Sequence, residues 1–159
     1  MHTKQKSAVV STFAIVATLP KGVVSDLFYG KLFTSAPELR RMFGADMMKQ
    51  GEALMGALTY VIDRLEDPQR EGEMVTALQD LGVRHVRYGV PHDSPYYSTV
   101  GAALIETLEA GLGDAFTAEV KEAWTAAYAL IVSVMTEAAK LVPARKNPAS
   151  GPAPVQHGA

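Results

Sequence analysis

Four histidines and no cysteines limit the metal-binding chemistry available to this chain. The histidines are His2, His85, His92 and His157. Apolar residues recur before His85 at Met74, Leu78 and Leu81, and this 4-3 spacing marks one face of an α-helix. His85 occupies the next position of the stripe, so we expect its ring to point inward. A buried neutral imidazole that bonds to protein through one nitrogen can offer the other to a metal.

Structural explanations for His85 compete with metal binding. The carbonyl of Leu81, four residues earlier, could accept one ring N–H and leave His85 as a satisfied core residue. The motif Gly89-Val90-Pro91 marks a nearby helix C-terminus, where a partial positive charge on His85 is favourable. Spacing alone favours these structural explanations, and a second observation is needed to overturn them.

Two other polar side chains lie beside apolar helix faces. Gln50 precedes Leu54 by four residues at the margin of such a face, and its amide could donate a hydrogen bond into an apolar cavity. Tyr29 follows Leu27 and Phe28, and its hydroxyl needs a partner if it is buried. Taken singly, Tyr29 is better explained as a core tyrosine and Gln50 as a solvated surface amide.

Helical periodicity predicts an all-α domain of about seven helices, because no segment alternates as a half-buried strand would. The expected helices are 6–18, 20–33, 35–43, 46–65, 67–88, 94–112 and 117–140. Their starts are marked by Pro20, by Ser35 with Glu38 in capping-box spacing, by Asp46, by Asp67-Pro68, by Ser94-Pro95 and by Thr117.

Composition excludes several classes of function. The chain has 159 residues, of which 48% are hydrophobic, which suits one domain with a core large enough to enclose a cofactor. Its net charge is only -2 and no basic cluster is interleaved with aromatics, so we expect no nucleic-acid partner. The absence of cysteine excludes disulfides, iron–sulfur clusters, thiolate zinc sites and cofactors attached through cysteine. Any cofactor is therefore expected to be non-covalent.

Two apolar runs raise the question of a membrane or a signal peptide. The run 8–19 has the length of a signal-peptide core, but no Ala-x-Ala site closes it and its spacing is that of a buried helix. The run 123–135 is too short to cross a bilayer. We therefore expect a soluble, cytoplasmic protein with no membrane contact. We expect residues 1–140 to form the domain, and the Pro-, Ala- and Gly-rich segment 141–159 to be a disordered tail.

Six strings in the chain resemble the bacterial globins, including single-domain haemoglobins and the haem domain of flavohaemoglobins. The strings are LFYGKLF (27–33), PELRRMF (37–43), QGEALM (50–55), RHVRYGV (84–90), YSTVG (97–101) and EAWTAAYALIVSVM (122–135). They occur in the order and with the spacing of that family over about residues 6–138. The resemblance implies a globin fold of about seven helices around non-covalent haem b, which is iron protoporphyrin IX.

Carried over by position, the resemblance also implies the roles of individual residues. His85 would be the proximal iron ligand, held by the carbonyl of Leu81, and Phe43 would pack flat on the porphyrin. Tyr29 and Gln50 would form the distal pair that stabilises a bound ligand. The remaining pocket positions implied are Leu54 above the iron, Arg84 near a propionate, and Tyr88, Val90, Tyr97 and Val100 along the proximal side and the haem edge.

One position departs from the family pattern. Flavohaemoglobins carry a glutamate fifteen residues after the tryptophan that matches Trp124, and here that position is Ala139. Glu137 lies two residues earlier, about 200° around the helix, so we do not expect it to take that place. The resemblance therefore favours a haem that binds ligands over one with a peroxidase-like electron push.

The expected function is reversible binding of oxygen or a similar diatomic molecule for storage, delivery or sensing. A phenol and an amide in an apolar pocket would each stabilise a partly negative ligand by about 1 kcal/mol or more. The alternative is an enzyme, a nitric oxide dioxygenase that makes nitrate and takes electrons from a separate reductase. A haem-based gas sensor and a helical interaction protein without cofactor also stay open, as do a monomer and a homodimer.

Overall fold

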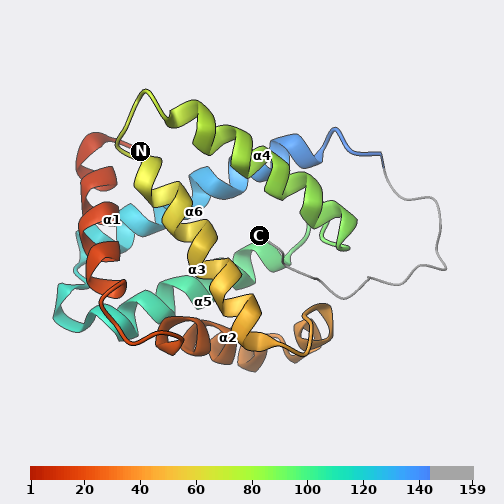
Figure 1. Cartoon of the computed structure of the whole chain (residues 1–159), viewed down its shortest axis with the longest axis horizontal. Coiled ribbons are helices and arrows are strands. Elements are labelled where there is room, and N and C mark those ends of the chain that lie inside the picture. Colours follow the sequence, from red (N-terminus) through yellow and green to blue (C-terminus); the bar gives the residue numbers. More distant parts are fainter. Residues whose placement is uncertain (144–159) are drawn as a thin grey trace.

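The computed structural model describes residues 1–143 and consists, in that part of the chain, of six α-helices and two 3-10 helices without a β-strand (Figure 1). The α-helices are α1 (Thr3–Val16), α2 (Val23–Ser35), α3 (Met47–Arg64), α4 (Glu71–Arg87), α5 (Tyr96–Leu112) and α6 (Ala118–Ala139). The 3-10 helices are η1 (Pro37–Met42) and η2 (Gly113–Ala115). The all-α prediction is confirmed, with the short third helix being a 3-10 helix. The predicted tail lies outside the described residues from position 144 onward.

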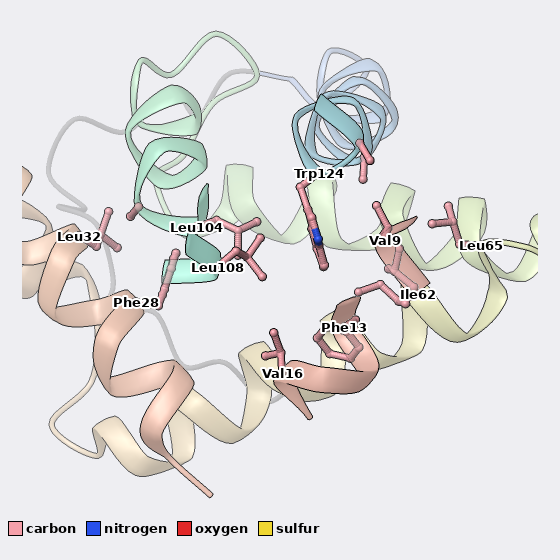
Figure 2. Close-up of a cluster of buried hydrophobic side chains, with 14 of the residues drawn as sticks. Val9, Phe13, Val16, Phe28, Leu32, Ile62, Leu65, Leu104, Leu108 and Trp124 are labelled. Carbon is pink, nitrogen blue, oxygen red and sulfur yellow. The ribbon is translucent and has the colours of Figure 1, made fainter. Parts of the chain in front are cut away.

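The helices pack in pairs that are distant in sequence. In Figure 1, α4 lies along α6, α2 lies along α5, and α3 crosses between them. The first helix packs against the last, and the indole N–H of Trp124 in α6 donates to the hydroxyl of Thr12 in α1 at 2.9 Å. Figure 2 shows Trp124 among the side chains of Val9 and Phe13 in the buried core. The apolar run near the N-terminus is thus a core helix, as predicted.

Two predicted helix starts are confirmed by side-chain caps. The carboxylate of Asp46 accepts from the backbone N–H of Lys49 at 3.0 Å at the start of α3. The hydroxyl of Thr117 accepts from the N–H of Val120 at 3.2 Å at the start of α6. Each cap satisfies one of the N–H groups that a helix leaves unbonded in its first turn.

Two other predicted starts are wrong. Pro20 belongs to a turn, closed by the bond from the N–H of Val23 to the Pro20 carbonyl, and α2 begins only after Gly22 at a φ of 88°. That left-handed conformation suits glycine and stops a continuous helix from Pro20. Ser35 and Glu38 form no capping box, because α2 continues through Ser35 and the Glu38 carboxylate accepts from the hydroxyl of Tyr96 at 3.2 Å.

The helices predicted to begin at Asp67 and Ser94 begin later in the chain. The Asp67 carboxylate accepts from the N–H of Gln69 at 3.0 Å, which makes a turn, and α4 begins at Glu71. The hydroxyl of Ser94 accepts from the N–H of Tyr96, where α5 begins. Within residues 1–143, no helix is long and apolar enough to cross a lipid bilayer.

Candidate functional site

A cavity of about 160 Å³ opens between η1, the end of α4, and the helices α5 and α6. Five of the predicted pocket residues line it: Phe43, His85, Val90, Tyr97 and Val100. Its walls are almost wholly apolar, since apart from the His85 ring and the hydroxyls of its tyrosines they carry aliphatic, aromatic and methionine side chains. An apolar pocket with a few convergent polar groups is the common form of a cofactor site.

The ring of His85 is anchored to its own helix. Its Nδ1 lies 2.8 Å from the carbonyl oxygen of Leu81, as the sequence predicted. A carbonyl only accepts, so Nδ1 carries the hydrogen and the lone pair of the neutral ring is on Nε2. Burial lowers the pKa of His85, the Leu81 hydrogen bond opposes this effect, and the charge of Arg84 lowers the pKa further. The imidazole is therefore neutral at physiological pH, which is the form that binds a metal.

Two tyrosine rings flank this histidine. The Tyr97 ring is 6.3 Å from the His85 ring, centroid to centroid, and only 23° from parallel, whereas the Tyr88 ring is 6.5 Å away and tilted by 58°. The Tyr97 hydroxyl is buried and has no hydrogen-bond partner within residues 1–143, and burial raises its pKa to about 12. The hydroxyl of Tyr128 donates to the carbonyl of Tyr97 and so ties α6 to the start of α5.

Tyr29 contacts both Phe43 and Gln50. The Tyr29 hydroxyl donates to the backbone carbonyl of Gln50 at 3.3 Å, and both side chains are buried, at 7% and 5% exposure. The explanation of Gln50 as a solvated surface amide is therefore wrong. The Tyr29 ring meets the Phe43 ring edge to face at 5.4 Å, and burial raises the Tyr29 pKa to about 12. The phenol thus stays protonated as a donor at any physiological pH.

The other predicted residues do not line the cavity. Leu81 contributes its carbonyl to His85, and Tyr88 contributes its ring contact. Leu54 is partly buried against the core, and Arg84 is half-buried beside His85. The structure therefore brings His85, Phe43, Val90, Tyr97 and Val100 together at one cavity, and Tyr29 is adjacent to it through its contact with Phe43.

Glu137 does not replace the carboxylate that position 139 lacks, where this chain has Ala139. Ala139 is buried at 2% exposure, whereas the Glu137 side chain is 69% exposed and pairs with Lys140 at 2.8 Å. The Lys140 hydrogen bond and charge lower the pKa of Glu137. The prediction that Glu137 does not reach the proximal side is confirmed.

Sequence reasoning missed more than half of the cavity lining. The additional residues are Leu32, Leu39, Met42, Tyr96, Tyr128, Ile131, Val132 and Met135. A signal was present for the group in α6, since Tyr128, Ile131 and Met135 recur at the spacing of three and four that marks one helix face. No comparable pattern marks Leu39 and Met42, because η1 is too short to show one.

The donor set fits a haem. Within residues 1–143, no group of three or more His, Cys, Asp or Glu side chains could hold a metal ion by itself. A metal on His85 would thus need its remaining ligands from a non-protein group such as a porphyrin. The apolar walls, the anchored imidazole and the aromatic ring of Phe43 suit a flat apolar macrocycle.

Known proteins similar to this chain include two flavohemoproteins and a globin domain. The chain is 28% identical over 110 residues to a flavohemoprotein of Vibrio cholerae, a stretch that covers 69% of this chain and 27% of that protein. A flavohemoprotein of Rhizobium meliloti is 28% identical over 135 residues, covering 83% of this chain and 32% of the relative. The chain thus spans a third or less of the length of these curated relatives. A crystal structure of the closed form of the HGbRL globin domain is 30% identical, covers 88% of this chain and 97% of that one, and superimposes with a TM-score of 0.40.

The family profile described as Globin matches residues 26–135, which are 110 of the 159 residues. This segment includes His85, the Tyr29 and Gln50 pair, and every residue that lines the cavity. The chain therefore belongs to the globin family and is a haem-binding globin.

Proposed function

We propose that this globin reversibly binds oxygen or a similar diatomic molecule on a non-covalent haem b, with His85 as the iron ligand and Tyr29 and Gln50 as the distal pair. The proposal rests on two observations: the buried contact of Tyr29 with Gln50 and with Phe43, and the imidazole of His85 that the Leu81 carbonyl anchors at the cavity that Phe43 also lines. When bound, haem supplies an iron with one coordination position for a small ligand.

The proximal side of the cavity holds the imidazole in one orientation. The Leu81 carbonyl fixes the tautomer that directs the Nε2 lone pair away from the helix backbone. A carbonyl accepts the Nδ1 hydrogen less strongly than a carboxylate would, and Ala139 provides no carboxylate. The imidazole thus stays a moderate electron donor, which favours ligand binding over cleavage of a bound ligand.

The distal side supplies hydrogen-bond donors in an apolar setting. The Tyr29 hydroxyl has a single hydrogen, and its 3.3 Å bond to the Gln50 carbonyl is long for an O–H donor. That hydrogen can be redirected to a partly negative ligand at little cost, because the bond it gives up is weak. The Gln50 amide is a second possible donor beside Tyr29. Each donor contributes about 1 kcal/mol or more, so the two together slow ligand release roughly tenfold or more.

The experiment that tests this proposal combines spectra with ligand release. Absorption spectra of the ferric, dithionite-reduced and carbon monoxide-bound protein should show a Soret band and a histidine-ligated haem. The His85→Ala variant should lose that spectrum. The Tyr29→Phe variant should release oxygen at least severalfold faster, whereas Tyr60→Phe, whose ring is exposed under Arg64, should not. An oxygen off-rate for Tyr29→Phe within twofold of wild type contradicts the distal role.

The alternative function is nitric oxide dioxygenation with electrons from a separate reductase. It is favoured by the curated relatives, which are named flavohemoproteins and are about two and a half times as long as this chain. The two functions differ in turnover. Sustained consumption of nitric oxide in the presence of oxygen, a reductase and reductant supports the enzyme, whereas consumption of one equivalent per haem supports binding alone.

A further inference from the structure

The helices α2 and α3 meet closely where Gly51 faces Ser25. A Cβ atom added at position 51 would lie 2.5 Å from the Ser25 hydroxyl oxygen and 2.8 Å from the Ser25 Cβ. Side-chain rotation of Ser25 would relieve the first contact but not the second, because the Cβ is fixed by the backbone. Both residues are buried, so neither helix can yield locally toward solvent. The missing side chain of Gly51 thus sets how near the two helices come.

The contact between Gly51 and Ser25 lies close to Tyr29 and Gln50 in both helices. Gln50 precedes Gly51 in α3, and Tyr29 follows Ser25 by four residues, on the same face of α2. The bond that joins the pair spans the same two helices, from the Tyr29 hydroxyl to the Gln50 carbonyl. Its length of 3.3 Å is near the outer limit for a hydrogen bond, so a small increase in helix separation would break it.

We propose that Gly51 and Ser25 are positioning residues that fix the separation of α2 and α3, hold Tyr29 against Gln50, and thereby set the release rate of a diatomic ligand. The inference rests on the proposed function. The Cβ of an alanine at position 51 would be about 0.6 Å closer to the Ser25 Cβ than an ordinary 3.4 Å contact, so the helices must separate by a comparable distance. That separation takes the Tyr29 hydroxyl out of reach of the Gln50 carbonyl, and it displaces the donor whose hydrogen a bound ligand would receive.

The test compares Gly51→Ala with Gly56→Ala. Both glycines are in α3, but a Cβ at position 56 has no atom within 4 Å, so Gly56→Ala changes helix propensity without changing the crossing. We expect Gly51→Ala to release oxygen at least threefold faster and to raise the carbon monoxide stretching frequency of the ferrous complex toward that of Tyr29→Phe. We expect Gly56→Ala to match wild type in both measurements.

Second-site rescue separates positioning from general damage. Replacing Ser25 with glycine removes both atoms that crowd position 51, so Gly51→Ala/Ser25→Gly should recover the wild-type release rate and stretching frequency. If Gly51→Ala does not fold, the double variant carries the test. A folded double variant that releases oxygen as fast as Tyr29→Phe overturns the proposal.

A Gly51→Ala/Tyr29→Phe double variant shows whether Gly51 affects oxygen release through Tyr29. If Gly51 acts through the tyrosine, Gly51→Ala has little further effect on release in a Tyr29→Phe background, and an undiminished effect there overturns the proposal. If Tyr29→Phe alone leaves release unchanged, the distal role in the proposed function fails instead. A crystal structure of Gly51→Ala then decides the positioning claim by itself, since an unchanged distance from the Tyr29 hydroxyl to the Gln50 carbonyl refutes it.

Discussion

Replacing Gly82 with alanine would make a methyl group clash with the backbone of Met135. A Cβ at position 82 in α4 would lie 2.1 Å from the Met135 carbonyl oxygen in α6 and 2.7 Å from its carbonyl carbon and Cα. These are backbone atoms, so no side-chain rotation relieves the contact. To reach an ordinary contact of 3.4 Å, α4 and α6 must move apart by about 1.3 Å.

The energetic cost of that movement follows from what α4 buries. Met74 and Leu78 are 3% and 2% exposed, and a shift of the helix would loosen the packing of both. Overpacking a well-packed interior costs about 1–3 kcal/mol, and here the obstacle is backbone, so we expect Gly82→Ala to cost about 3 kcal/mol. That is a large part of the 5–15 kcal/mol typical of a domain. Because His85 is three residues further along α4, haem retention should fall as well.

Urea unfolding of the apoprotein measures this cost directly. The matched control is Gly72→Ala in the same helix, where an added Cβ has no atom within 4 Å. That variant should be unchanged or more stable by up to about 1 kcal/mol, because alanine is the better helix former. The two substitutions are the same chemical change with opposite expected signs. A free energy of unfolding for Gly82→Ala within about 0.5 kcal/mol of wild type would refute the close-contact reasoning.

Other substitutions and a pH titration test the rest of the structure. Thr12→Val leaves the buried indole N–H of Trp124 without its acceptor and should cost about 1–3 kcal/mol in urea unfolding, with an unchanged value counting against that bond. Asp46→Ala removes the cap of α3 and should cost about 1 kcal/mol, with a larger loss of α3 amide protection than of α6 protection in hydrogen exchange. Burial raises the pKa of Tyr29 and of Tyr97 to about 12, above the usual value of 10, so folding favours their neutral forms. Their contribution to apoprotein stability is therefore complete below pH 10 and lost as the pH rises toward 12, and a stability that stays constant over that range would contradict the raised pKa values.

Local sequence patterns predicted the helices better than their starting points. Periodicity identified every long helix, because each one buries an apolar face and that face must repeat every three to four residues. Starts marked by a single side-chain cap, such as Asp46, were also predictable. The helix starts predicted at Pro20 and Ser35 were wrong because proline and serine are equally suited to turns and helix ends. Tertiary packing determines which of the two forms.

The candidate site was predictable where one residue acts on its own helix. The bond from His85 to the Leu81 carbonyl depends only on a spacing of four residues. The contact between Tyr29 and Gln50 could not be predicted from local spacing, because the two residues are 21 positions apart and meet through the crossing of two helices. The spacing of Tyr128, Ile131 and Met135 predicts that the three share one face of α6, but the distance at which that face packs against α4 depends on Gly82 and could not be predicted.

The pairing of α1 with α6 has a consequence for how the protein is made. Trp124 meets Thr12 across 112 positions of the chain, and Val9 is fully buried in the same core. On a ribosome that adds about 5–20 residues per second, α1 would emerge roughly 5–20 s before the helix that covers it. Its apolar face stays without its native cover for that time, so nascent chains should be susceptible to aggregation or to chaperone capture until α6 has been synthesised.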